Sequence, residues 1–207
     1  LLNMITIIDY GAGNIKSIRN MLKKIGVESC ISNEPEVIAN ASKLILPGVG
    51  HFDFGMKNLN SSGLVGVLHQ SVMVNKTPLL GICLGAQLLG NSSEEGTEVG
   101  LGWMDMDIVK FDVSKIDAQF KIPHMGWNEI EVNQSSRLLA ILEQVARFYF
   151  VHSFHMQPKN KEDILTQTSY GYDFASAVKK DNVYGVQFHP EKSHKYGMQL
   201  LSNFSKI

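Results

Sequence analysis

The fold is decided by one stretch of the sequence, Pro78-Leu79-Leu80-Gly81-Ile82-Cys83-Leu84-Gly85-Ala86-Gln87. Residues 78–82 are apolar and predict a buried strand, while the segment from Ala86 onward is typical of a helix. Cys83 stands at the junction, with a glycine two residues away on either side. This pattern is typical of a nucleophile elbow, a strained strand–turn–helix connection that presents a reactive side chain at the end of a strand.

The two glycines and the helix have separate tasks in such an elbow. Side chains in place of Gly81 and Gly85 would collide with the substrate or with the opposing backbone. The helix N-terminus lies beside the sulfur, where its amides and dipole favour the thiolate of Cys83. The alternative is a buried cysteine that packs as a small hydrophobic residue. Cys30 fits that alternative, whereas the spacing around Cys83 favours a nucleophile.

The segments around the elbow predict an α/β fold. In the first half, strand-like runs at Met4–Ile8 and Lys43–Leu46 alternate with helical patterns at Ile15–Ile25 and Gly63–Val74. An alternating order of this kind is typical of a parallel sheet with helices on both faces. Two shorter elements, a strand at Glu28–Ser32 and a helix at Glu34–Asn40, continue the order.

The second half is rich in strands and has few helices. The expected strands are Met106–Lys110, Trp127–Val132, Arg147–Val151, Ile164–Ser169, Ser176–Lys180 and Val183–Phe188. Lys180-Asp181-Asn182 predicts a hairpin turn, and residues 193–204 predict a closing helix. We find no linker, so we expect one domain, residues 1–207, with an open mixed, mostly parallel sheet.

Composition excludes several classes of protein. Lys and Arg number 19 and Asp and Glu 20, and this balance argues against an electrostatic nucleic-acid binder. No apolar run approaches the roughly 18 residues needed to cross a bilayer, so no membrane association is expected. Only two cysteines occur, and residues 1–8 lack a basic leader and a cleavage site. A reduced, cytoplasmic setting without a signal peptide is the expectation.

A second chemical signal lies in Tyr184-Gly185-Val186-Gln187-Phe188-His189-Pro190-Glu191. His189 ends a predicted strand, and Glu191 follows at a spacing that can return its side chain to the same side. A carboxylate that orients an imidazole, which in turn acts as general base for a thiol, is the arrangement of a catalytic triad. The alternative is a surface His-Pro turn with a solvated glutamate. The cysteine elbow in the same sequence favours the triad over this alternative.

A third signal, Leu46-Pro47-Gly48-Val49-Gly50, also ends a strand. Acyl-transfer intermediates need amides aimed at the developing oxyanion, and a loop with two glycines can turn its N–H groups that way. The amide of Leu84 would be the other donor. The glycine pair alone could be an ordinary turn. The three strand ends nevertheless converge where open α/β sheets place their sites.

These segments, taken with Asp9–Asn14, Pro123–Asn128 and Tyr149–Ser153, resemble the class I glutamine amidotransferases with a flavodoxin-like core. Among them, the order and content of the segments are similar to the HisH family, the glutaminase subunits of imidazole glycerol phosphate synthase. The resemblance implies that Cys83 attacks the carboxamide of glutamine and releases ammonia through a glutamyl thioester. It assigns proton transfer to His189, its orientation to Glu191, and the oxyanion amides to Gly50 and Leu84.

The resemblance also implies a glutamine pocket built from Gln87, Glu95, His152, Ser153 and Phe154. Two of these side chains have alternative interpretations. Gln87 could be a helix-surface amide, and Glu95 could be a solvated loop charge.

The partner implied by the resemblance is a synthase subunit with a (β/α)₈ barrel, HisF-like, bound as a heterodimer. Asn14, Tyr149 and Lys192 match positions that face this partner. We expect no cofactor and no metal, because four of the other histidines lack a metal-ligand spacing. We interpret them as structural or partner-facing; they are His124, His152, His155 and His194.

The acceptor of the ammonia has alternatives. The stretch Lys192–Met198 and the segments 90–92 and 101–103 lean toward paralogues that feed a different synthase, such as one that amidates a surface-polysaccharide sugar. Pyridoxal phosphate synthesis is another acceptor pathway. A cysteine peptidase would share the thiol chemistry but would need a long open groove to bind a peptide. An inert binding module of the same fold would be expected to lose a triad member, and here all three are present.

Overall fold

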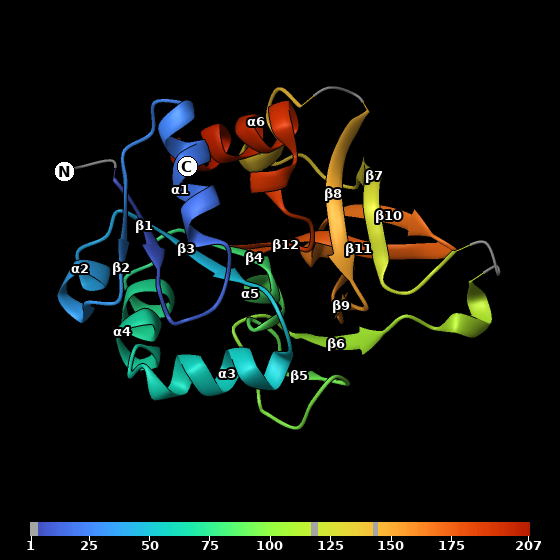
Figure 1. The fold of residues 1–207 in the computed structure, drawn as a ribbon, viewed down its shortest axis with the longest axis horizontal. Helices are drawn as coiled ribbons and strands as arrows, with labels where there is room; N and C mark the ends of the chain where they lie inside the picture. Colours follow the sequence, from blue (N-terminus) through green and yellow to red (C-terminus); the bar gives the residue numbers. More distant parts are fainter. Residues whose placement is uncertain (1–3, 117–119, 143–144) are drawn as a thin grey trace.

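A computed structural model describes residues 4–116, 120–142 and 145–207. Its centre is a 12-stranded sheet whose main path has the order β2-β1-β3-β4-β12-β11-β10-β7-β8, with β9 joined to β11, β6 to β9 and β5 to β6 (Figure 1). The strands are β1 Ile5–Ile8, β2 Ser29–Ser32, β3 Lys43–Gly48, β4 Leu79–Cys83, β5 Ser92–Ser93, β6 Met106–Lys110, β7 His124–Val132, β8 Ala146–His152, β9 Phe154–Pro158, β10 Ile164–Tyr170, β11 Tyr172–Lys180 and β12 Val183–Val186. The open mixed sheet expected from the sequence is confirmed.

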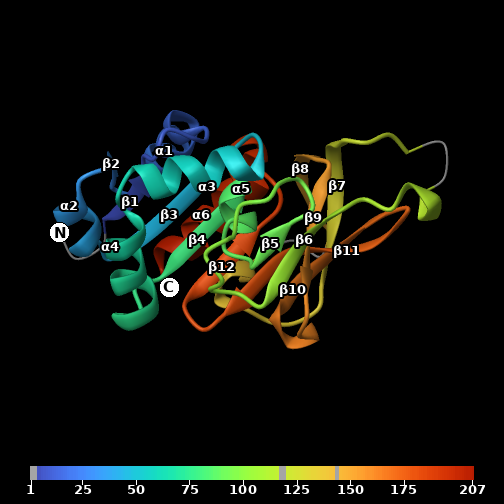
Figure 2. The ribbon, with the colours of Figure 1, turned by 90° about the horizontal axis from the view of Figure 1, so that it is seen from below.

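Helices cover both faces of the parallel part of the sheet, as predicted. They are α1 Ile15–Lys24, α2 Pro35–Ala39, α3 Phe52–Ser61, α4 Val65–His69, α5 Leu84–Gln87 and α6 His194–Ser205. In Figures 1 and 2, α1 and α6 lie on one side of β1, β3 and β4, and α3 and α4 lie on the other.

The alternation of side chains along the strands explains the two faces. On β3, Ile45 joins the hydrophobic core shared with α1 and α6, whereas Leu44 and Leu46 join the core shared with α2, α3 and α4. All three side chains are fully buried. A strand buried on both faces reads as a continuous apolar run, which is why the sequence predicted it.

The second half of the chain is antiparallel. β11 and β12 pair through the predicted hairpin at Lys180-Asp181-Asn182, and β10 pairs with β11 on the other side. Three elements were missed from the sequence: α3, β9 and the two-residue strand β5. Helix α3 contains Gly55 and two asparagines, which are poor helix formers, and β9 follows β8 after the single residue Ser153. The predicted helix at residues 63–74 is α4 followed by a π-helical turn, Gln70–Val74.

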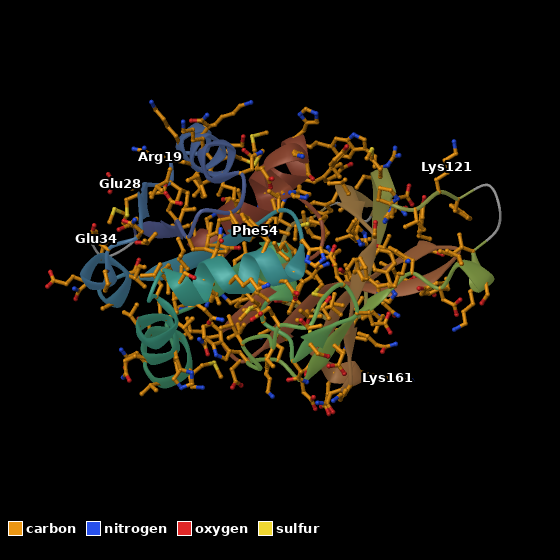
Figure 3. The ribbon with its side chains drawn as sticks, turned by 60° about the horizontal axis from the view of Figure 1, so that its bottom comes forward. Arg19, Glu28, Glu34, Phe54, Lys121 and Lys161 are labelled. Atoms are coloured by element: carbon orange, nitrogen blue, oxygen red, sulfur yellow. The ribbon has the colours of Figure 1, made fainter. Side chains whose placement is uncertain are left out.

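Exposed side chains of both the parallel and the antiparallel half are labelled in Figure 3. In Figure 3, Arg19, Glu28 and Glu34 lie on the parallel half of the molecule, and Lys121 and Lys161 lie on the antiparallel half. Phe54 on α3 is 51% exposed. In the part of the chain that the structure covers, we find no helix that combines the length and the apolar character needed to cross a membrane.

The elbow at Cys83 is the strained point of the fold. Cys83 has φ 53° and ψ −113°, an unusual backbone conformation for a residue with a side chain. The strain is held by close packing, because a Cβ on Gly85 would lie 1.9 Å from the carbonyl oxygen of Leu46. A Cβ on Gly81 would lie 2.7 Å from Cα of Ala86, and one on Gly48 would lie 2.6 Å from the amide of Gly85. The glycines therefore let β3, β4 and α5 touch at backbone distance.

This packing predicts the cost of a single methyl group. Gly85→Ala should lower the free energy of unfolding by about 3 kcal/mol or more, because the backbone of β3 must move away. Gly66→Ala in the exposed part of α4 is the matched control, since no atom lies within 4 Å of the added Cβ. It should raise stability by about 0.5–1 kcal/mol. Urea denaturation measures both, and equal stabilities would contradict this account of the elbow.

Candidate active site

A pocket of about 510 Å³ opens where the carboxyl ends of β3, β4 and β12 meet. Its lining consists of Gly13, Asn14, Val49, Gly50, Cys83, Leu84, Gln87, Glu95, Val151, His152, Ser153, Phe154, His189 and Lys192. The three segments singled out in the sequence therefore meet in one cavity. Tyr149 and Glu191 are the two predicted site residues that lie outside this lining.

The histidine and the glutamate form a buried pair. Nδ1 of His189 lies 2.8 Å from Oε1 of Glu191, and both side chains are only 1% exposed. Because a carboxylate accepts, Nδ1 carries the proton and Nε2 is left for the thiol. Nε2 is buried and has no hydrogen-bond partner of normal geometry among the described residues. The pair thus presents a free imidazole nitrogen toward the pocket.

Two opposing effects set the charge of His189. Burial alone would lower the pKa of His189, but the nearby sulfur of Cys83 and the carboxylate of Glu191 together raise the pKa to about 10. The imidazolium form is therefore stabilised near neutral pH. A protonated imidazole beside a thiol is the arrangement that supports a cysteine nucleophile.

The segment that follows β3 forms the opposite wall. Gly50 has φ +103°, a conformation that favours glycine, and the backbone at Val49 and Gly50 is exposed. The hydroxyl of Tyr10 donates to the carbonyl of Pro47 at 2.7 Å and fixes the start of this segment. Burial, with the charge of Cys83 adding to it, raises the pKa of Tyr10. Leu84 is the first residue of α5, where backbone amides have no partner within the helix.

Gln87 is 5% exposed, so the surface alternative for this residue is wrong. Its Nε2 donates to the carbonyl of Phe154 and to Oε1 of Gln187, both at 3.1 Å. Both hydrogens are therefore used, and Oε1 is the atom left to accept from a ligand in the pocket.

Glu95 is half-buried and lines the pocket. Its Oε2 accepts the amide of Phe52 at 2.8 Å, where α3 begins. The carboxylate thus ties the loop after the elbow helix to α3, and among the described residues its other oxygen makes no hydrogen bond.

Gln187 was missed as a site residue. It is fully buried, and its Nε2 lies 3.8 Å from the sulfur of Cys83 while its Oε1 accepts from Gln87. The signal was available, because Gln187 precedes His189 by two residues and strand alternation puts both on one side. The sulfur, the imidazole and the pocket amide therefore belong to one buried network.

The residues expected to face a partner lie near the pocket mouth. Asn14 and Lys192 line the pocket, and Nζ of Lys192 lies 5.5 Å from the centre of the Tyr149 ring. On the neighbouring strand β7, Met125 is 61% and Trp127 is 40% exposed. The surface beside the pocket mouth therefore combines polar side chains with the exposed apolar side chains of Met125 and Trp127.

The four histidines that were interpreted as structural or partner-facing contact aromatic rings. His124, His152 and His155 are buried around Phe111, and His194 stacks on Trp127 with a ring distance of 5.5 Å. In the described ranges, no group of three or more His, Cys, Asp or Glu residues could hold a metal ion.

Comparisons with known proteins agree on one family. The family model described as "Glutamine amidotransferase class-I" matches residues 6–207. A protein of Methanococcus maripaludis named imidazole glycerol phosphate synthase subunit HisH 2 is 56% identical and is matched over 98% of this chain and 99% of its own length. One of Pseudomonas aeruginosa with the same name is 53% identical over 99% of this chain and 100% of its own length.

Solved structures agree on the fold. A protein of Thermoplasma acidophilum described as a putative GMP synthase subunit superposes with a TM-score of 0.72 at 20% identity, over 100% of this chain and 94% of that one. A structure of PurLQS from Thermotoga maritima gives 0.74 at 16% identity, over 99% and 98%. The chain belongs to the class I glutamine amidotransferase family and, within it, to the HisH subunits.

The buried histidines predict how stability depends on pH. Burial lowers the pKa of His124 to about 4 and that of His152 well below its ordinary value. The unfolded chain, in which histidine has a pKa of about 6.5, therefore binds more protons in mild acid. The free energy of unfolding should then fall as pH drops from about 6.5 toward 4. His189 acts oppositely, since its contribution is lost only as pH rises through about 10.

Urea denaturation at a series of pH values measures this slope. His124→Phe removes one of the titrating groups, so its stability should depend less steeply on pH below about 6.5. An identical slope in the variant would contradict the assignment of His124 as a neutral buried imidazole.

Proposed function

We propose that the chain is the glutaminase subunit of an imidazole glycerol phosphate synthase, and that residues 1–207 form one glutamine amidotransferase domain. It hydrolyses L-glutamine to glutamate and ammonia with Cys83, His189 and Glu191. The observation that carries the proposal is the buried His189–Glu191 pair next to Cys83, whose backbone is strained. The same pocket also contains Oε1 of Gln87, which is left to accept a hydrogen bond from a ligand. The cysteine peptidase and the inert module fit this family and this complete triad less well.

The first half of the reaction forms a thioester. The sulfur of Cys83 attacks the carboxamide carbon of glutamine, and the carbonyl π electrons move onto oxygen. The protonated Nε2 of His189 gives its proton to the leaving nitrogen, so the C–N bond breaks and ammonia departs. In the second half, His189 takes a proton from water, the water oxygen attacks the thioester, and glutamate leaves as Cys83 is regenerated. Glu191 keeps the imidazole oriented throughout.

Different parts of the pocket bind different groups of the substrate. The amides of Leu84 and Gly50 face the developing oxyanion. Oε1 of Gln87 and the carboxylate of Glu95 suit the α-ammonium group of glutamine, since both are acceptors. Backbone amides of the His152–Phe154 segment suit its α-carboxylate. These assignments keep the ligand's charged end away from the sulfur.

Ammonia released into neutral water is protonated and loses its nucleophilic lone pair. A partner that closes over the pocket would prevent this loss. We propose a synthase subunit with a (β/α)₈ barrel that docks on the side of Asn14, Tyr149 and Lys192 as a heterodimer in the cytoplasm. The exposed Met125 and Trp127 beside the pocket support this side for the partner.

Replacement of the nucleophile tests the chemistry. Cys83→Ala should abolish glutamate release from glutamine, while the complex with the synthase should still make product from added ammonium salts. Cys30→Ala is the matched control, because this half-buried cysteine lies on the edge strand β2 and should leave activity unchanged. Glutamate release in Cys83→Ala would overturn the proposal.

The acceptor is tested by the partner. We propose that the isolated chain is a weak glutaminase, gated by an oxyanion loop, Pro47–Gly50, that is misaligned until the synthase binds its ligand. Glutamate release should therefore rise at least about tenfold when the imidazole-glycerol-phosphate synthase barrel and its nucleotide ligand are added. The relatives at 56% and 53% identity are both numbered HisH 2, which keeps a paralogue with another acceptor as the second candidate. No stimulation, with Cys83 still alkylated by a glutamine-mimicking diazoketone, would favour that paralogue. Full activity of the isolated chain would contradict the gating.

A further inference from the structure

A chain of hydrogen bonds crosses the antiparallel half of the sheet and ends at the glutamine pocket. The amide nitrogen of Asn128 lies 3.0 Å from the carbonyl of Ser169 and 3.3 Å from Nε2 of His124. Nδ1 of His124 lies 3.0 Å from Nε2 of His152. Nδ1 of His152 lies 2.8 Å from the carbonyl of Phe154. None of the three catalytic residues takes part in it.

The proton positions along this chain follow from its two ends. A carbonyl can only accept, so Nδ1 of His152 carries a hydrogen. Because burial lowers the pKa of His152 and keeps the ring neutral, its Nε2 carries a lone pair. That lone pair needs a donor, so Nδ1 of His124 carries a hydrogen as well, and Nε2 of His124 accepts from Asn128. The other end agrees, because the amide oxygen of Asn128 already accepts from the backbone of Glu129 at 2.8 Å. Both imidazoles are thus neutral and protonated on Nδ1.

The Phe154 carbonyl is the junction with the active site. It accepts from His152 and also from Nε2 of Gln87 at 3.1 Å. Gln87 in turn donates to Gln187, whose own amide nitrogen lies 3.8 Å from the sulfur of Cys83. Polar contacts therefore run without a gap from β7 to the nucleophile.

The surroundings of His124 fix its ring without touching the substrate. The ring is 2% exposed and lies outside the pocket lining. It is sandwiched between Tyr170, at a ring distance of 3.9 Å, and Phe150, at 4.8 Å. Burial keeps the pKa of His124 low, so the ring stays neutral and can donate to a neutral neighbour. An imidazole that is packed so tightly has one orientation in which to donate.

We propose that His124 is a positioning residue for glutamine: acting through His152, it holds the Phe154 carbonyl and thereby aims Oε1 of Gln87 at the ligand. This inference rests on the proposed function, because it assigns the ligand of the pocket as glutamine. Loss of the His124 donor leaves Nε2 of His152 buried without a partner, which favours other arrangements of the 152–154 segment. Binding of glutamine weakens, while the Cys83–His189 chemistry is untouched.

The first test reads the proton positions directly. In the ¹⁵N-labelled wild-type chain, long-range ¹H–¹⁵N correlation spectra distinguish imidazoles protonated on Nδ1 from those protonated on Nε2. His124 and His152 should both be neutral and protonated on Nδ1 at neutral pH. A proton on Nε2 of either ring, or an imidazolium form, overturns the chain. This test needs no variant and no activity.

The second test separates positioning from general damage. In the complex with the synthase, His124→Phe keeps an aromatic ring between Phe150 and Tyr170 but removes the donor. We expect KM for glutamine to rise about tenfold, with kcat per alkylatable Cys83 within about twofold of wild type. His124→Asn, whose amide nitrogen can stand in for Nδ1, should recover most of the KM. His155→Phe is the matched control, because the buried His155 ring also contacts Phe111 but hydrogen-bonds to the Met156 carbonyl and the Tyr172 hydroxyl instead of the Phe154 carbonyl.

The outcomes distinguish this inference from the proposed function. If wild type releases glutamate but His124→Phe has the KM of His155→Phe, the positioning role is overturned and the glutaminase stands. An equal fall of kcat in both variants, with KM unchanged, overturns it as well. If wild type releases no glutamate with any synthase, the proposed function fails, and the positioning role for glutamine fails with it even where the spectra show the predicted tautomers.

Discussion

The structure depends on the backbone contact between the elbow and β3. A Cβ on Gly85 would stand 1.9 Å from the carbonyl of Leu46, so the two segments meet with no side chain between them. This contact holds Cys83 at φ 53°, at the wall of the pocket. It also brings the end of β3 beside the first amide of α5. The nucleophile and the wall that faces it are thus placed by one packing constraint, and the strain is sustained by the surrounding buried strands.

Buried imidazoles serve two opposite purposes in this chain. His189 gains a sulfur and a carboxylate as neighbours, which outweigh burial and raise the pKa of His189 to about 10. Among the described residues no carboxylate pairs with His124 or His152, so burial dominates and lowers the pKa of each. His189 therefore carries a proton that it can give to a leaving group, whereas His124 and His152 stay neutral and hold a hydrogen-bonded geometry. The same side chain is therefore chemical or structural according to whether a charge compensates its desolvation.

The pocket is assembled from segments that lie far apart in the sequence. Gln87 donates to Phe154, 67 residues away, and to Gln187, 100 residues away. Each contact lies at the carboxyl end of a strand or just beyond it, which is where the crevice of an open α/β sheet forms. Since these amides are buried, each one needs a partner, and the partners fix which atom of Gln87 remains for a ligand.

The sequence by itself determined the alternation of strands and helices in the first half, the elbow and the triad candidates, because apolar runs, glycine spacing and His-Pro-Glu are local patterns. It did not predict α3 or β9, whose residues carry weak propensities and are held by packing. It also missed Gln187, and it left Gln87 between a surface and a pocket role. Only the tertiary structure decided the roles of Gln187 and Gln87, since a hydrogen bond between side chains far apart in the sequence produces no periodic pattern in that sequence. The tautomers of His124 and His152 follow from such contacts alone.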